Sequence, residues 1–143
     1  MKTNNKGFSL VELIVVIAIM AILAAVAIPT FSGFIKKAQI SNDVSFVNDI
    51  TYAAKVASVE KSGNITITVT VDDDKTAGTI VITKGDFTAT LKDEAVQSTS
   101  NGVGDATIAA DINASIDWAY KFSHYDSRSG TLKLAADGKS LTN

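Results

Sequence analysis

The chain has 143 residues, the size of one small domain, and 13 Lys and Arg against 15 Asp and Glu give a formal net charge of −2. This mild acidity argues against a surface that coats nucleic acid, because such a surface needs clustered basic residues. The chain has no cysteine, so packing must stabilise an exported domain without disulfides.

A short basic leader ends at Gly7 and precedes an apolar segment that carries one carboxylate. Residues 13–28 are uniformly apolar, and Glu12 lies directly before them. A charge at mid-membrane is disfavoured by roughly 2.5–3.5 kcal/mol and by less near an interface, so Glu12 calls for a partner. Cleavage between Gly7 and Phe8 would create one, because the new amine is positive and a neighbouring copy could supply it to Glu12.

The residues from Lys6 to Leu13 read Lys-Gly-Phe-Ser-Leu-Val-Glu-Leu, and an apolar helix follows them. This motif resembles the class III signal segment of the type IV pilins, and the resemblance covers residues 1 to about 37. It implies that a membrane prepilin peptidase cuts after Gly7 and methylates the amine of Phe8. It also implies that Glu12 of one copy neutralises that amine in a neighbour. Removal of residues 1–7 deletes two lysines, so the formal charge changes from −2 to −4.

A secretory signal peptide or a plain signal anchor is the alternative for this segment. Residues 24–27 have the small side chains of a cleavage site, but an ordinary signal peptide has a shorter apolar core and no Glu12. Residues 8–28 span roughly 31 Å as a helix, which matches a bilayer core. The segment is therefore long enough to remain in the membrane, and the resemblance places the bulk of the chain outside.

Pro29 removes one helical hydrogen bond, so a kink or local opening is expected there, with Gly33 adding flexibility. The other interpretation is that Pro29 marks the end of a membrane helix. The resemblance implies that residues 21–29 lose helicity in an assembled filament.

An amphipathic pattern begins at residue 36. Apolar residues recur at three- and four-residue steps, and Gly63 follows as a good helix terminator, so we expect a helix from Phe8 to about Lys61. The apolar stripe consists of Ile40, Val44, Val47, Ile50, Ala54 and Ala57.

Alternation of apolar and polar residues predicts strands after Gly63. We expect a meander over residues 65–71, 79–83 and 87–91, a loop over 93–104, and strands at 116–122 and 131–135. One helical face covering this sheet gives an α+β, pilin-like fold. The predicted parts are a leader (1–7), a transmembrane and filament-core helix (8–35) and an exported domain (36–143) with an amphipathic helix (36–61) and a β-sheet (62–143).

Catalytic patterns are weak. Ser58 and Lys61 have the Ser-x-x-Lys spacing, but the accompanying acyltransferase motifs are missing, and a helix end explains them better. His124 is the only histidine and lies in a predicted turn, which leaves little for a dyad or a zinc site. We therefore expect no enzyme and no cofactor.

Calcium is the one metal with candidate ligands. Residues 72–74 are three aspartates, but they lack the order of a calcium loop and suit a turn. Asp126 and Asp137 are the second candidate, because pseudopilins can hold calcium near their C-terminus. Trp118 and Tyr120 are expected to pack on the helix, with an aromatic receptor surface as the alternative.

The prediction is a structural subunit of a type IV filament used for adhesion, motility or DNA uptake. Its expected partners are copies of itself, the prepilin peptidase, the assembly platform, the membrane before assembly and minor pilins. Its expected location is the bacterial cytoplasmic membrane as precursor and then the extracellular pilus. A pseudopilin of a secretion or competence system and a membrane-anchored binding module are the alternatives.

Overall fold

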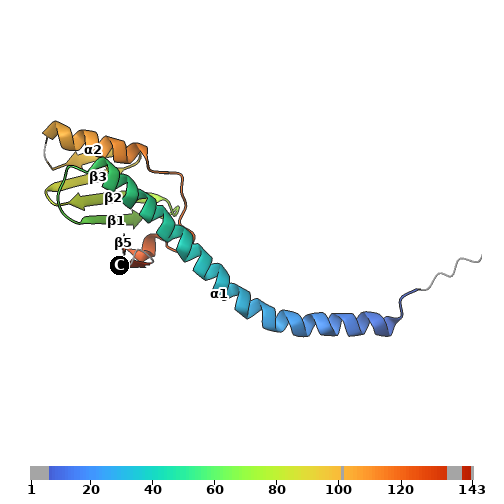
Figure 1. Cartoon of the computed structure of the whole chain (residues 1–143). Helices are drawn as coiled ribbons and strands as arrows, with labels where there is room; N and C mark the ends of the chain where they lie inside the picture. The colour runs from blue at the N-terminus through green and yellow to red at the C-terminus, as the bar shows by residue number, and fades with distance from the viewer. Residues whose placement is uncertain (1–6, 101, 135–139, 143) are drawn as a thin grey trace, which may run out of the picture. The chain divides into compact units, whose positions relative to one another are not determined.

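The computed structural model describes residues 7–100, 102–134 and 140–142. It contains helix α1 (Leu10–Ala57), strands β1 (Ile65–Val71), β2 (Ala77–Lys84), β3 (Phe87–Lys92) and β4 (Ala95–Thr99), helix α2 (Gly102–Ala114), the short 3-10 helix η1 (Ser127–Ser129), and strands β5 (Thr131–Leu134) and β6 (Leu141–Thr142) (Figure 1). The chain divides into two compact units, Met1–Lys37 and Ala38–Asn143.

The described part of the first unit is mainly the apolar beginning of α1. Its large apolar side chains are all at least half exposed, from 50% for Val15 to 74% for Leu10. Helical structure continues through Pro29 and Gly33. Within the described residues, α1 is the one helix that is long and apolar enough to cross a membrane.

The second unit confirms the predicted α+β arrangement of a long N-terminal helix with an antiparallel sheet. Its six strands have the order β4-β3-β2-β1-β5-β6, and every neighbouring pair is antiparallel. The meander β1-β2-β3 was predicted from alternation, and its register places Ile67 opposite Ile82 and Ile82 opposite Ala89. These inward residues are fully or almost fully buried, whereas Thr66 on the other face is exposed.

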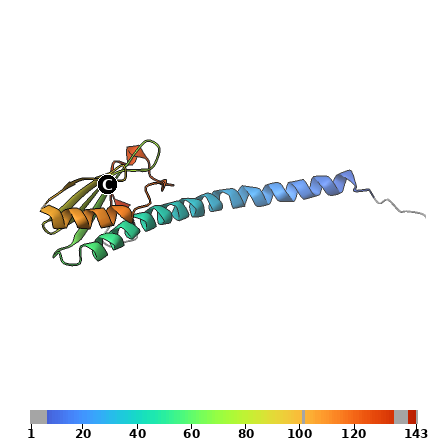
Figure 2. The same ribbon diagram turned by 90° about the horizontal axis from the view of Figure 1, so that it is seen from above.

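One face of the sheet is covered by α2 and by residues 38–57 of α1, which lie on the same side of it (Figure 2). The predicted stripe on α1 is confirmed, since Val44, Val47, Ile50 and Ala54 are at most 5% exposed. They share one core with the inward side of the strands. Burial of a Val or Ile side chain contributes roughly 1.5–3 kcal/mol, so this shared core is the main stabilising element.

The predicted loop at residues 93–104 is wrong. That segment contains β4 and the beginning of α2. Asp105, Ala109, Ile112 and Ile116 are buried at three- and four-residue steps, which is the period of a helix. The region 62–143 is therefore not made of strands and turns alone.

The predicted strand at residues 116–122 is also wrong, because this segment contains only turns and irregular backbone. Its alternating aromatic residues pack by tertiary contacts rather than by strand pairing. The long helix ends at Ala57, four residues before the predicted Lys61, in a turn closed by the Lys61 N–H donating to the Ser58 carbonyl at 3.0 Å.

Candidate functional site

The beginning of α1 is fixed by two hydrogen bonds of Ser9. The Ser9 hydroxyl oxygen accepts from the Val11 N–H at 3.2 Å, and Glu12 Oε2 accepts from the Ser9 N–H at 2.8 Å. Serine before the first helical residue with Glu three positions later is a capping box, which satisfies two N–H groups that have no partner inside the helix. Glu12 therefore has a structural role in its own helix, which the sequence analysis did not assign to it.

This cap leaves the predicted cleavage site outside the helix. Gly7 and Phe8 have no regular secondary structure, and Phe8 is 90% exposed. A Cβ placed on Gly7 would meet no atom within 4 Å. The bond between the two residues is accessible, as a peptidase substrate must be.

Glu12 uses one of its two carboxylate oxygens in the cap. In residues 7–100, 102–134 and 140–142, no basic side chain forms an ion pair with it. A carboxylate accepts hydrogen bonds at both oxygens, so Oε1 can receive a second donor while Oε2 remains bound to Ser9. The cap thus holds the acid at a fixed place on the helix.

The polar side chains near Pro29 are satisfied within the helix. The Thr30 hydroxyl donates to the Ala27 carbonyl at 2.8 Å, and the Ser32 hydroxyl donates to the Pro29 carbonyl at 2.9 Å. These bonds suit an apolar environment, because an unpaired hydroxyl there would be costly. The kink at Pro29 and Gly33, and the opening of residues 21–29 in a filament, stay predictions.

In the second unit, Asp43 is a buried carboxylate that the sequence analysis missed. It has no exposed surface and accepts from the Tyr120 hydroxyl at 2.7 Å and from three backbone N–H groups of the segment after it. These donors are Ser123 at 2.8 Å, His124 at 2.8 Å and Tyr125 at 3.3 Å. The signal in the sequence that could have identified Asp43 is an acidic residue within the apolar stripe of α1. Asp43 fastens residues 120–125 to the helix.

Aromatic rings pack on Tyr120, whose hydroxyl binds this carboxylate. Phe46 stacks on Tyr120 with ring centroids 4.3 Å apart, and Phe122 meets both rings edge-on at 5.5 Å. Burial raises the pKa of Tyr120 above its usual range, and the hydrogen bond to Asp43 raises it further. The expected packing of Tyr120 on the helix is confirmed.

The residues with weak catalytic patterns have structural partners. The Ser58 hydroxyl donates to the Ala54 carbonyl of its own helix. Lys61 forms an ion pair at 2.6 Å with Asp105, which is 1% exposed. The His124 ring lies edge-on against Tyr125, 5.0 Å between centroids. Ser58, Lys61 and His124 thus all contact other groups of their own chain.

The first calcium candidate lies at an acidic hollow of about 520 Å³ lined by residues 72–74 and Asp93. A hydrogen bond from the Thr76 hydroxyl lowers the pKa of Asp74. Within the described residues, no group of three or more His, Cys, Asp or Glu is placed to hold a metal ion. The hollow thus has charge but no assembled ligand set.

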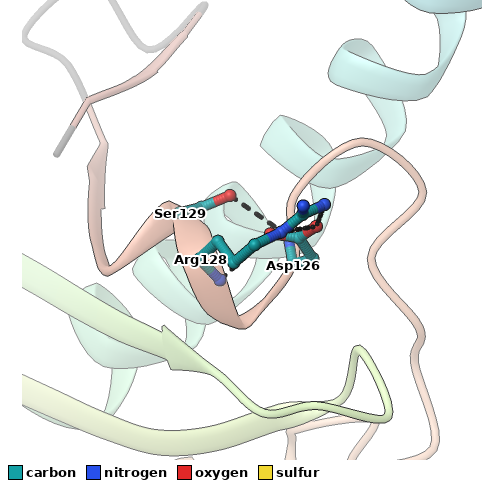
Figure 3. A network of polar contacts seen from close by, with 3 residues as sticks. All are labelled: Asp126, Arg128 and Ser129. Carbon is teal, nitrogen blue, oxygen red and sulfur yellow. Dashed lines mark hydrogen bonds and ion pairs between the residues drawn. The ribbon is translucent and has the colours of Figure 1, made fainter.

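The carboxylate of the second candidate, Asp126, already binds Arg128 of the same chain (Figure 3). It caps η1 by accepting from the Arg128 N–H at 3.0 Å, and its other oxygen forms a 2.6 Å ion pair with the Arg128 guanidinium. The Asp126 N–H donates to the Ser129 hydroxyl at 3.1 Å, and the Arg128 hydrogen bonds lower the pKa of Asp126. A cation there would have to displace Arg128. Asp137 lies outside the described residues.

Comparisons with known proteins cover part of the chain. Residues 2–28 match the family model described as the prokaryotic N-terminal methylation motif. The chain is 38% identical over 85 residues to a type IV major fimbrial protein FimA of Dichelobacter nodosus, covering 55% of this chain and 54% of that protein. It is 43% identical over 56 residues to a fimbrial protein of Pseudomonas aeruginosa, covering 39% of this chain and 36% of that protein.

The chain thus spans about half the length of one curated relative and about a third of others, such as a second FimA of Dichelobacter nodosus, 46% identical over 50 residues. No solved structure gives a significant match. The family model covers the cap of α1 and the beginning of its apolar stretch.

Proposed function

We propose that this chain is a member of the type IV pilin family and the structural subunit of a surface filament, which its N-terminal methylation motif and its similarity to fimbrial proteins support. The resemblance found in the residues from Lys6 to Leu13 is confirmed by those matches. The relatives named above are fimbrial proteins, and the proposal gives no catalytic role to Ser58, Lys61 or His124.

The observation that carries the proposal is the bare apolar surface of α1 between Leu10 and Ile35. This stretch is about 39 Å long as a helix, and all of its large apolar side chains are at least half exposed. Such a surface needs either lipid or other apolar helices around it. A subunit that is held in the membrane first and in a helical bundle later meets that need in both states.

Processing at Gly7 supplies the charge that assembly needs. A prepilin peptidase cuts the exposed bond before Phe8 and methylates the new amine. In the filament, Glu12 of one copy receives the Phe8 amine of a neighbour while the Ser9 N–H continues to hold its other oxygen. Either charge left unpaired in apolar packing costs several kcal/mol, so this pairing sets the axial register.

The precursor resides in the bacterial cytoplasmic membrane with the second unit outside, and the assembled filament is extracellular. An assembly platform extracts the subunit, and the filament serves adhesion, motility or DNA uptake. Tandem mass spectrometry of the chain from whole cells tests the first step. A chain that begins with N-methylated Phe8 is expected, and a chain that begins at Met1 or within residues 24–27 would refute the processing step.

Glu12 allows a second test that separates its two roles. Glu12→Gln keeps an acceptor for the Ser9 N–H, since Gln also completes a capping box, but it removes the charge. Glu12→Ala removes both. We expect both variants to be cleaved normally and to yield few sheared filaments, because both lose the intersubunit charge pair.

Normal filament yield from Glu12→Gln, with loss only in Glu12→Ala, would show that the cap rather than the charge matters. The length of sheared wild-type filaments separates a pilin from a pseudopilin, since a pseudopilin forms only a short structure.

A further inference from the structure

The second unit has a groove of about 420 Å³ between α1 and α2. Its α1 side presents Tyr52 and Val56, which are 71% and 59% exposed although the opposite face of the same helix is core. Ala53 and Ala57 lie beside them and are partly buried. Two large apolar side chains next to two small ones make a surface that can accept a bulky apolar side chain from another molecule.

The rim of this groove is acidic. Asp49 on α1 and Asp111 on α2 line it, and both are exposed. Neither carboxylate has an ion pair or a hydrogen-bonding partner within the part of the chain that the structure describes. The groove therefore fits a segment that combines a bulky apolar residue with a cation, and it disfavours an acidic one.

Residues 34–37 of this chain have that combination. Phe34 is 67% exposed, and Lys37, also exposed, lies three positions later on the same helix face. Lys36 adds a second exposed positive charge. No ion pair involves either lysine within the described residues.

We propose that the groove binds residues 34–37 of a second copy of the chain, with Phe34 against Tyr52 and Val56 and the lysines at Asp49 and Asp111. This interface rests on the proposed filament and adds to it a contact between the helix of one subunit and the folded unit of another. It joins copies at a place distant in sequence from the pairing of Glu12, so the two contacts can be tested separately.

Charge reversal in the full-length chain tests the interface. Asp49→Lys with Asp111→Lys is expected to lower the yield of sheared filaments at least tenfold, while the amount of cleaved subunit in the cells stays the same. Adding Lys36→Asp and Lys37→Asp to that variant is expected to restore the yield. The matched control is Glu60→Lys with Asp86→Lys, which makes the same charge change at two exposed acids outside the groove.

The interface would be overturned by a normal filament yield from the Asp49 and Asp111 reversal or by an equal loss in the control. It would also be overturned if the variant with all four substitutions did not recover the yield. Wild-type filaments in such an experiment would leave the proposed function standing, whereas their absence from wild-type cells would refute that function itself.

The absence of native cysteines allows a direct measurement in assembled filaments. Lys37→Cys with Val56→Cys is expected to give a ladder of disulfide-linked copies on oxidation. Lys37→Cys with Thr66→Cys, which lies on the outer face of the sheet, is expected to give none. A link from Val56→Cys to a different protein, or equal ladders in both variants, would overturn the proposal.

Discussion

Replacement of Asp43 should be the most destabilising single polar change in the second unit. Its two oxygens accept four hydrogen bonds at 2.7–3.3 Å, and Asp43→Ala removes both acceptor oxygens and so all four bonds at once. A hydrogen bond to a charged group contributes about 1.5–3 kcal/mol. Ser123 is exposed and Tyr120 is only partly buried, so water replaces part of what is lost. We therefore expect the free energy of unfolding to fall by about 3–5 kcal/mol.

That loss is a large share of the roughly 5–15 kcal/mol that stabilises a typical domain. Asp43→Asn should also destabilise, because its NH₂ group would face N–H donors that need an acceptor. The assay is urea unfolding of the full chain in detergent micelles, followed by fluorescence of Trp118, the only tryptophan. Asp49→Asn is the control, and its exposed carboxylate should change stability by less than about 0.5 kcal/mol. A loss below about 1 kcal/mol in Asp43→Ala would refute the reasoning.

Three further changes test other parts of the molecule. Ser9→Ala removes the cap of α1 and should cost about 0.5–2 kcal/mol locally, seen as faster amide exchange in the first helical turn, whereas Ser9→Thr should behave like the wild type. Gly7→Val should block leader removal, because a branched side chain does not fit where the peptidase expects glycine; a correctly shortened chain by mass spectrometry would contradict this. The pKa of Tyr120 is raised on folding mainly by burial, so the unfolded state loses its proton first and stability should fall as the pH rises above 10.0, the ordinary value. Tyr120→Phe should weaken that fall in urea titrations on either side of this pH, and an unchanged slope would rule Tyr120 out as its source.

The N-terminal elements were predictable because their signals are local. Sixteen consecutive apolar residues after Glu12 require a long helix, and strict alternation at residues 65–71 requires a strand. The capping box also has a local signal, since Ser9 and Glu12 have its spacing, although the sequence analysis assigned Glu12 only to an intersubunit pair.

One error arose where apolar residues alternate in a segment that is not a strand. Ile116, Trp118, Tyr120 and Phe122 alternate like a strand, but this segment has no neighbouring strand to pair with. The Phe122 N–H donates instead to the Lys75 carbonyl, and the Tyr120 hydroxyl donates to Asp43 of α1. No pattern within the segment itself indicates a partner about 80 residues earlier in the chain.

The sequence by itself determined the apolar helix, its charged beginning and the meander β1-β2-β3, because each depends on neighbours within a few residues. Only the tertiary structure decided that β5 pairs with β1, that α2 joins α1 on one face of the sheet, and that Asp43 fastens residues 120–125. These arrangements depend on burial and hydrogen bonding between segments far apart in the chain, where a favourable contact must offset the entropy of closing a long loop. Patterns of neighbouring residues do not indicate how contact energy and loop-closure entropy balance.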